Sequence, residues 1–322
     1  MRLVTLNKAV DQLNLIDKLA YNKGFAVIEK SVDAPAAFRV GNTLSAEQYL
    51  EFMNRIGDQS NFLKTIKRID TNRTTIDLNA LSIESRKTKR PTAGAAWNTS
   101  TNATIDNVGS KLTLLRNQLV YILEYDVLQD NADNPNFENA VNDLVAKQAA
   151  NDLADLAING TDDDYTASAF LELNKGFLTL FAADSNVRDV TYASYATKDD
   201  LFAAMFDALA ERDKSRTDLK FFVNWTDHEA YRNLKQSAIT TGDANKERTA
   251  LVYNGIPIVP VDFMPDSKAF LAPDQNLVYA MGKNDNVSIQ AIDDPEGVCF
   301  RLLVNYMADF GYFDGDKVVY AS

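Results

Sequence analysis

The sequence predicts an α+β fold with an extended hairpin and one unusually long helix. Three observations support this prediction. Helical and strand-like patterns intermix along the 322 residues without the alternation that a parallel βαβ sheet requires. Residues 135–159 carry one continuous helical pattern. Two strand-like segments within residues 61–125 flank a long polar stretch.

The composition is that of a globular protein, and it excludes several kinds of site. Apolar residues make up 46% of the chain and charged residues 24%, which is close to the globular average. The net charge of −12 argues against a protein that wraps nucleic acid, because such a face must supply positive charge. The single cysteine, Cys299, excludes an intrachain disulfide and a multi-thiolate zinc site, and the single histidine, His228, leaves little imidazole chemistry.

No stretch approaches the roughly 18 consecutive apolar residues that a membrane helix needs. The N-terminus is interrupted by charge at Lys8 and Asp11, so it lacks the apolar region of a signal peptide. We therefore expect a soluble protein of a reducing compartment with no membrane partner.

The first 60 residues predict an arm. A short amphipathic stripe from Leu6 to Ile16 and a capping box that starts at Ser45 predict two short helices. The stretch between them has no sustained period and contains Pro35. Two short helices on such a connection have no core of their own.

Residues 61–125 predict an extended hairpin. Its two limbs are rich in Thr, Ile and Leu with the partial alternation of strands. The tip between them is polar and contains Pro91. A loop of this length inside a compact domain is uncommon and is usually functional or disordered. The tip has too little apolar surface to bury on its own molecule.

The long helix has recognisable ends. Asn134 can cap it, Pro135 suits the first helical position, and Asn159-Gly160 can end it. At 1.5 Å per residue, such a helix forms a rod of roughly 36 Å. Its apolar stripe contains Val141, Val145, Ala149, Leu153 and Leu156.

Helices and strands alternate irregularly after this rod. A capping box at Thr197 predicts a helix, residues 220–225 predict a buried strand, and a further box at Thr226 predicts another helix. This placement puts His228 on an exposed cap. From Ile256 onward the chain is β-rich.

No motif predicts an enzyme, a cofactor or a metal. The sequence lacks the Gly-rich patterns of dinucleotide and Walker phosphate sites. Arg232 stands where a zincin needs its second histidine. A Cys–His nucleophile would have to combine Cys299 with His228, yet we expect Cys299 to pack in a strand. The run Asp162–Asp164 could attract a divalent cation, but it lacks the spaced ligands of an EF-hand loop, so a solvated acidic turn is favoured.

Two segments carry opposite charge. Residues 64–90 contain eight Lys or Arg and three Asp or Glu, whereas residues 124–164 contain eleven Asp or Glu and one Lys. The basic limb of one copy can therefore lie on the acidic rod of another, or both can be solvated surfaces. Trp97 can anchor such a contact or pack within its own loop. The candidate intersubunit residues are Arg86, Lys87, Lys89, Arg90, Trp97, Asp143, Asp152 and Asp155.

The order of these parts resembles the major capsid proteins of tailed bacteriophages, which have the Hong Kong 97-type fold. The resemblance covers essentially the whole chain and is closest to the contractile-tailed enterobacterial phage branch. Each matching stretch is weak alone, and their order and spacing carry the resemblance. These stretches are NFLKTI (61–66), AINGT (157–161), NKGFL (174–178), YNGIPIV (253–259) and NYMADFGYFDG (305–315).

The resemblance implies a division of the chain into parts with separate roles. Its parts would be an N-terminal arm (1–60), an extended loop (61–125), a peripheral domain with the spine helix (126–196), an axial domain (197–290), and closing strands that return to the peripheral domain (291–322).

The resemblance also implies a function. The chain would be a structural, non-enzymatic protein that self-assembles from hexamers and pentamers into an icosahedral shell around double-stranded phage DNA, without sequence-specific binding. Its partners would be other copies, a separate scaffolding protein, a portal and a maturation protease. Its location would be the virion capsid, assembled in the cytoplasm of a bacterial host. Two alternatives remain: the shell of a cellular nanocompartment with the same fold, and a cytosolic Cys/His hydrolase.

Overall fold

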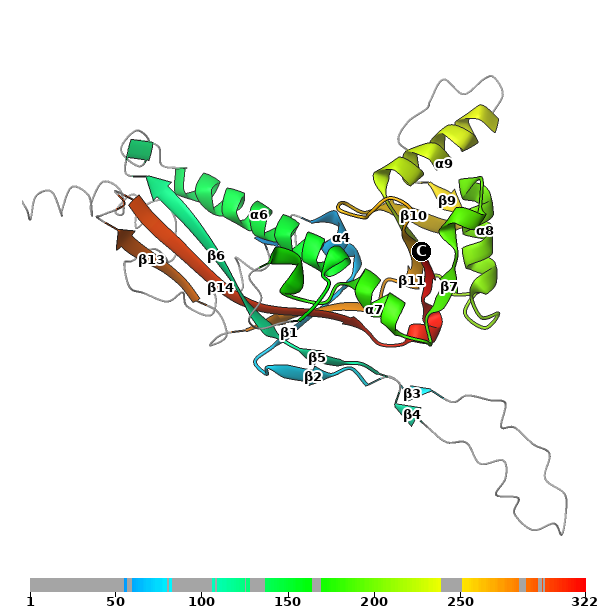
Figure 1. Cartoon of the computed structure of the whole chain (residues 1–322), viewed down its shortest axis with the longest axis horizontal. Helices are drawn as coiled ribbons and strands as arrows, with labels where there is room; N and C mark the ends of the chain where they lie inside the picture. Colours follow the sequence, from blue (N-terminus) through cyan, green and yellow to red (C-terminus); the bar gives the residue numbers. More distant parts are fainter. Residues whose placement is uncertain are drawn as a thin grey trace, which may run out of the picture.

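The computed structural model contains two β-sheets that share a core, a long helix beside one sheet and a projecting ribbon (Figure 1). The segment predicted as an arm lies almost wholly outside the described residues, as do Arg86, Lys87, Lys89, Arg90 and Trp97. The structure describes residues 55–56, 60–79, 81–82, 106–107, 109–124, 126–127, 137–163, 169–238, 251–283, 288–294, 297 and 299–322.

The first sheet is built around β14, a strand of 14 residues. One edge of β14 pairs with β6 along ten residues, from Cys299 opposite Glu124 to Ala308 opposite Leu115. Its other edge pairs with β13 near its start and with β12 near its end, and β1 adds to β12 in parallel. The strands are β1 (Lys67–Thr71), β6 (Leu115–Glu124), β12 (Leu277–Gly282), β13 (Ser288–Asp294) and β14 (Cys299–Tyr312).

The second sheet has six strands in the order β7-β15-β11-β8-β10-β9. Two helices, α8 (Lys198–Ala208) and α9 (Trp225–Ala238), pack on one of its faces. The remaining strands are β7 (Arg188–Val190), β8 (Leu219–Val223), β9 (Val252–Tyr253), β10 (Ile256–Pro260), β11 (Ala269–Pro273) and β15 (Val319–Ala321).

Because successive side chains of a strand point to opposite faces, the second sheet contributes side chains to two hydrophobic cores. In β8, Phe221 packs among the residues under α8 and α9, while Phe222 points to the opposite face. There Phe222 stacks on Phe270 at 4.7 Å between ring centroids and meets the edge of Phe62 at 5.8 Å. This central aromatic core joins the two sheets.

The long helix α6 (Phe137–Asn159) confirms the predicted rod within two residues. It packs on the face of the first sheet that carries Val304 and Tyr306 of β14. Alanines fill much of its buried side, and Leu153 is only 1% exposed. Its C-terminal end enters the central core beside α4 (Asn61–Thr65), α7 (Phe177–Ala183) and a 3-10 turn, η3 (Phe170–Glu172).

The projecting ribbon contains only those parts of the two predicted limbs that lie nearer the tip. β2 (Thr75–Asp77) pairs with β5 (Lys111–Thr113), and β3 (Leu81–Ser82) pairs with β4 (Asp106–Asn107). β1 and β6, which also lie within 61–125, belong to the first sheet. The ribbon is anchored at its base, where Leu78, Leu112 and Leu114 are buried against β12.

One predicted cap is confirmed and one is wrong. The Thr197 hydroxyl accepts from the Asp200 amide at 3.2 Å and begins α8. Helix α9 begins at Trp225, before the predicted cap Thr226, because the Asn224 side chain accepts from the Asp227 amide at 2.7 Å. This shift turns His228 inward, where it is 6% exposed, so the expectation of an exposed histidine is also wrong.

Candidate functional site

The structure separates the two residues that a nucleophilic site would need. Cys299 is buried at the start of β14, and His228 lies in α9 over the other sheet, at the opposite side of the molecule (Figure 1). Burial and the nearby Arg232 lower the pKa of His228. Among the described residues, no group of three His, Cys, Asp or Glu could hold a metal ion, and no helix is long and apolar enough to cross a membrane.

The acidic residues predicted for intersubunit contact do not form one surface. Asp143 is exposed on α6, but Arg55 of the same chain forms an ion pair with it at 3.0 Å. Asp152 accepts from Gln148 at 2.7 Å and is half-buried, and burial raises its pKa. Its negative charge also contributes, after burial, to the raised pKa of Tyr121, about 12. Asp152 therefore faces its own sheet.

Asp155 belongs to a different group of residues, at the end of α6. It accepts from the Asn159 side chain at 2.6 Å, and the same amide donates to the carbonyl of Phe263 at 2.7 Å. Phe263 lies in the connection between β10 and β11. The end of the long helix is thus tied to the second sheet.

Phe263 and Trp225 are the exposed aromatic residues of this junction. Phe263 is 45% exposed, and its φ of 64° is a conformation that few non-glycine residues adopt. Trp225 is 55% exposed, and its indole Nε1 donates to Asp262 at 2.7 Å. The ring of His228 meets the indole edge-on at 5.8 Å. The bond to Asp262 thus holds the exposed indole of Trp225, and the bond from Asn159 holds the backbone of Phe263, whose side chain is exposed.

Three carboxylates belong to the hydrogen bonds of this junction. Asp155 and Asp262 have the contacts given above, and Asp266 accepts from the Asn224 side chain at 2.9 Å. Within the described ranges, none of the three forms an ion pair with a Lys or Arg. We call Asp155, Trp225, Asp262, Phe263 and Asp266 the aromatic–acidic surface.

Sequence reasoning identified Asp155 but missed the other members of this surface. Trp225 was placed only at the end of a strand, and Phe263 only within a β-rich region. The sequence offers one signal for this surface. Phe263 stands just before Met264 and Pro265, and the proline interrupts the strand-like stretch that begins at Ile256.

A second candidate surface is the face of the first sheet opposite α6. Residues opposite one another in adjacent strands point to the same face, and the register aligns Val120 with Leu303 and both Ile122 and Ile292 with Arg301. Val120, Ile122 and Ile292 are between 44% and 61% exposed. The ribbon base covers the other half of this face. In the part of the chain that the structure describes, no other element packs on the half of this face that carries Val120, Ile122 and Ile292.

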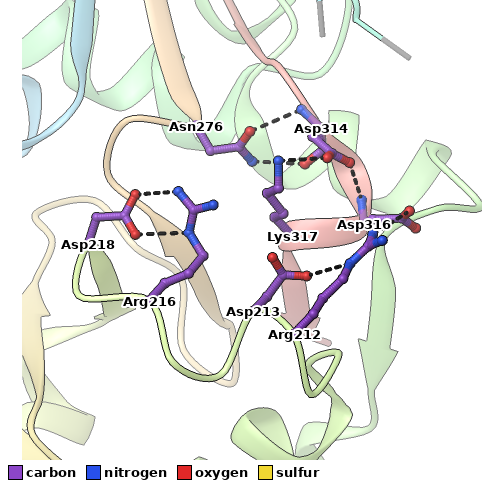
Figure 2. A network of polar contacts seen from close by, with 8 residues as sticks. All are labelled: Arg212, Asp213, Arg216, Asp218, Asn276, Asp314, Asp316 and Lys317. Carbon is purple, nitrogen blue, oxygen red and sulfur yellow. Dashed lines mark hydrogen bonds and ion pairs between the residues drawn. The ribbon is translucent and has the colours of Figure 1, made fainter. Parts of the chain in front are cut away.

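The two sheets are joined at a polar network (Figure 2). Two short connections pass between them, from β11 to β12 and from β14 to β15, and Asn276 links these two connections. Its side chain donates to the Asp314 carbonyl at 2.8 Å and accepts from the Asp314 amide at 3.0 Å. Lys317 pairs with the Asp314 carboxylate at 2.9 Å, and Arg216 holds Asp218 through two bonds.

The ribbon base contains one carboxylate with an unusual proton affinity. Asp309 of β14 accepts from the amide of Thr113 in β5 at 2.7 Å and from the Phe310 amide at 2.9 Å. Burial raises the pKa of Asp309 to about 6 despite these bonds, with a smaller contribution from Asp163 that Lys175 opposes. Through its bond from Thr113, Asp309 links the ribbon to the first sheet.

Comparison with solved structures establishes the fold. The chain is similar to a chain of the satellite phage P4 procapsid that includes the size determination protein, with a TM-score of 0.63 and 13% identity over 85% of this chain and 98% of that one. It is also similar to the capsid of the native GTA particle, with a TM-score of 0.56 and 14% identity over 82% and 89% of the two chains. These likenesses confirm the α+β fold of phage capsid proteins.

A third likeness concerns a cellular shell. The holo-SrpI encapsulin complex from Synechococcus elongatus matches with a TM-score of 0.50 and 11% identity, over 81% of this chain and 86% of that one. No protein-family model matches the sequence, and a search of the curated proteins finds no significant match. The assignment to the contractile-tailed enterobacterial branch stays a prediction.

Proposed function

We propose that this chain is a major capsid protein, which self-assembles through hexamers and pentamers into an icosahedral shell around the double-stranded DNA of a tailed phage. The observation that carries the proposal is the likeness to the P4 procapsid chain, which spans 85% of this chain and 98% of that one. Because the match covers most of this chain and nearly all of the other, it concerns the overall architecture and no single motif.

Features of the isolated subunit support this proposal. The ribbon buries three leucines at its base. Three large apolar residues, Val120, Ile122 and Ile292, are exposed on one face of the first sheet. Exposed apolar patches on a soluble protein commonly mark contacts with other chains. The net charge of −12 suits a container whose wall does not grip DNA.

We further propose the division into arm (1–60), extended loop (61–125), peripheral domain (126–196), axial domain (197–290) and closing strands (291–322). A separate scaffolding protein, a portal and a maturation protease are the proposed partners. The proposed location is the virion capsid, assembled in the bacterial cytoplasm, and no enzymatic activity is proposed. The separation of Cys299 from His228 argues against the Cys/His hydrolase.

The test is electron microscopy of the purified protein, produced alone and together with the scaffolding protein encoded near its gene. We expect closed particles with fivefold vertices. A chain that stays monomeric under every assembly condition, with its ribbon protected from protease, would contradict the proposal.

A nanocompartment shell is the second candidate, supported by the likeness to the encapsulin complex. The contents of particles isolated from the native source distinguish the two candidates. Nuclease-protected double-stranded DNA of uniform length supports the phage capsid, whereas a single enriched enzyme without DNA supports the nanocompartment.

A further inference from the structure

We infer that the aromatic–acidic surface is the docking site for the basic loop tip, residues 84–97, of a second copy of this chain. The inference rests on the proposed function, because it names the partner of one intersubunit contact. It replaces the simpler expectation that the loop lies along the acidic helix α6.

The first argument is that the helix does not offer the expected row of free carboxylates. Asp143 is already paired with Arg55, and Asp152 is half-buried with its bond to Gln148. Asp155 is also partly buried and accepts from Asn159, but Asn159 bonds the Phe263 carbonyl as well, which links Asp155 to the connection that carries Asp262 and Asp266. The negative charge available to a partner is therefore at the end of α6, next to Asp262 and Asp266.

The second argument is the built geometry of the two aromatic rings. Trp225 is fixed by its bond to Asp262, and the backbone carbonyl of Phe263 is fixed by Asn159. Phe263 keeps a φ of 64° although more than two fifths of the residue is exposed. Unfavourable backbone conformations tend to persist at functional positions. Rigid, exposed Trp and Phe side chains lose little conformational entropy when a partner covers them.

The third argument is the chemistry of the occupant. An acidic surface with two exposed aromatic rings fits a segment that is both basic and aromatic. Residues 84–97 combine Arg86, Lys87, Lys89 and Arg90 with Trp97, and no other five-residue stretch of the sequence contains four Lys or Arg. The described end of the ribbon, β3 and β4, lies on the opposite side of the molecule from α9 (Figure 1). A contact between two copies is therefore favoured over a contact within one.

The first experiment measures whether assembly covers Trp225. The chain has two tryptophans, so the full-length variant Trp97→Phe leaves Trp225 as its only tryptophan. We expect the emission of free subunits to be red-shifted and readily quenched by acrylamide, and that of particles to be blue-shifted with quenching reduced at least threefold. Equal quenching in subunits and particles would overturn the inference.

The second experiment removes charge while keeping the hydrogen bonds. The triple variant Asp155→Asn, Asp262→Asn and Asp266→Asn retains an acceptor oxygen at each position. Since exposed ion pairs contribute up to about 1 kcal/mol each, the protein concentration needed for assembly should rise between about tenfold and hundredfold. A matched triple variant of exposed residues on β7, on α8 and just after α8 should assemble like the unaltered chain: Asp189→Asn, Asp207→Asn and Glu211→Gln. Equal effects of the two triple variants would contradict the docking site.

The third experiment identifies the occupant. Thr226 is exposed beside Trp225, and Ala96 precedes Trp97 in the loop tip. Protein with Thr226→Cys and protein with Ala96→Cys are mixed, assembled and treated with a thiol-to-thiol crosslinker, while buried Cys299 stays unreactive. We expect linked pairs from the mixture only. Shielding of Trp225 without such a link would mean that another segment or another protein is the occupant, and the inference would fail. If the unaltered chain forms no particles, the proposed function fails instead.

Discussion

Gly160 and Gly176 lie so close together that neither position has room for a side chain. The amide of Gly176 donates to the carbonyl of Gly160 at 2.9 Å. A Cβ on Gly160 would lie 2.0 Å from the Asn174 carbonyl oxygen, and a Cβ on Gly176 would lie 2.6 Å from the Gly160 amide nitrogen. The end of α6 and the start of α7 therefore meet through bare backbone.

The first prediction is that Gly160→Ala destabilises the subunit by about 3 kcal/mol, because the added methyl group meets backbone atoms that cannot rotate away. Urea unfolding of the free subunit measures the change. Gly255→Ala is the control, since its Cβ would have nothing within 4 Å. Its positive φ of 80° should cost only about 1–2 kcal/mol. Equal losses at the two positions would contradict the close contact.

The second prediction concerns packing of the long helix. Leu153 is 1% exposed in the central core, whereas Leu144 on the same helix is 68% exposed. Leu153→Ala should lower the free energy of unfolding by about 2–5 kcal/mol. Leu144→Ala should change it by less than about 0.5 kcal/mol. The urea midpoints of the two variants test this, and a larger loss for Leu144→Ala would mean that the helix is rotated about its axis.

The third prediction concerns the link between the two sheets. Asn276→Ala removes both bonds to the Asp314 backbone and leaves buried polar groups without a partner, which should cost about 1–3 kcal/mol. Lys317→Ala removes only a partly exposed ion pair with Asp314 and should cost less than about 1 kcal/mol. Hydrogen exchange should show faster exchange of the Asp314 amide in the first variant and not in the second. No change at that amide would argue against the link.

The fourth prediction concerns the proton affinity of the ribbon base. The pKa of Asp309 is raised from 3.8 to about 6, so the folded state binds a proton that the unfolded state has already released. The stabilisation from this proton is fully present below pH 4 and is lost as the pH rises through 6. Asp309→Asn does not titrate, so the stability of the variant relative to the unaltered chain should rise from pH 4 to pH 7. A pH-independent loss accompanies this rise, because the two carboxylate oxygens accept from two different backbone amides and an amide side chain offers only one acceptor oxygen.

Urea midpoints measured at half-unit pH steps follow this difference. Asp207→Asn is the control, because this carboxylate is 79% exposed. Its midpoints should run parallel to those of the unaltered chain. Parallel curves for Asp309→Asn as well would show that Asp309 is not held in a desolvated site.

Local patterns predicted several elements from the sequence alone. The helix of residues 135–159 was recognised because its stripe, its proline start and its glycine end are all local signals, and α6 has almost the same bounds. The cap at Thr197 was predicted for the same reason. The α+β class followed from the irregular order of helices and strands.

Pairing between distant segments could not be read from local patterns. β1 and β6 have strand-like sequences, but their partners, β12 and β14, are about 180 residues or more away in the sequence. Local patterns therefore predicted that β1 and β6 belong to one hairpin, whereas in the structure both are strands of the first sheet. The cap at Thr226 failed because Asn224 competes for the same helix start, and only tertiary packing decides which residue caps it.

The sequence by itself determined which segments are helical, where the basic and acidic charges lie and which chemistries are absent, because each depends on residue identity or on short spacing. Only the tertiary structure decided how each carboxylate of the long helix is engaged within the subunit. It paired Asp143 with Arg55, partly buried Asp152 against its own sheet, and linked Asp155 through Asn159 to Phe263. The physical reason is that burial and charge pairing are set by contacts between residues far apart in the sequence, which local patterns do not contain.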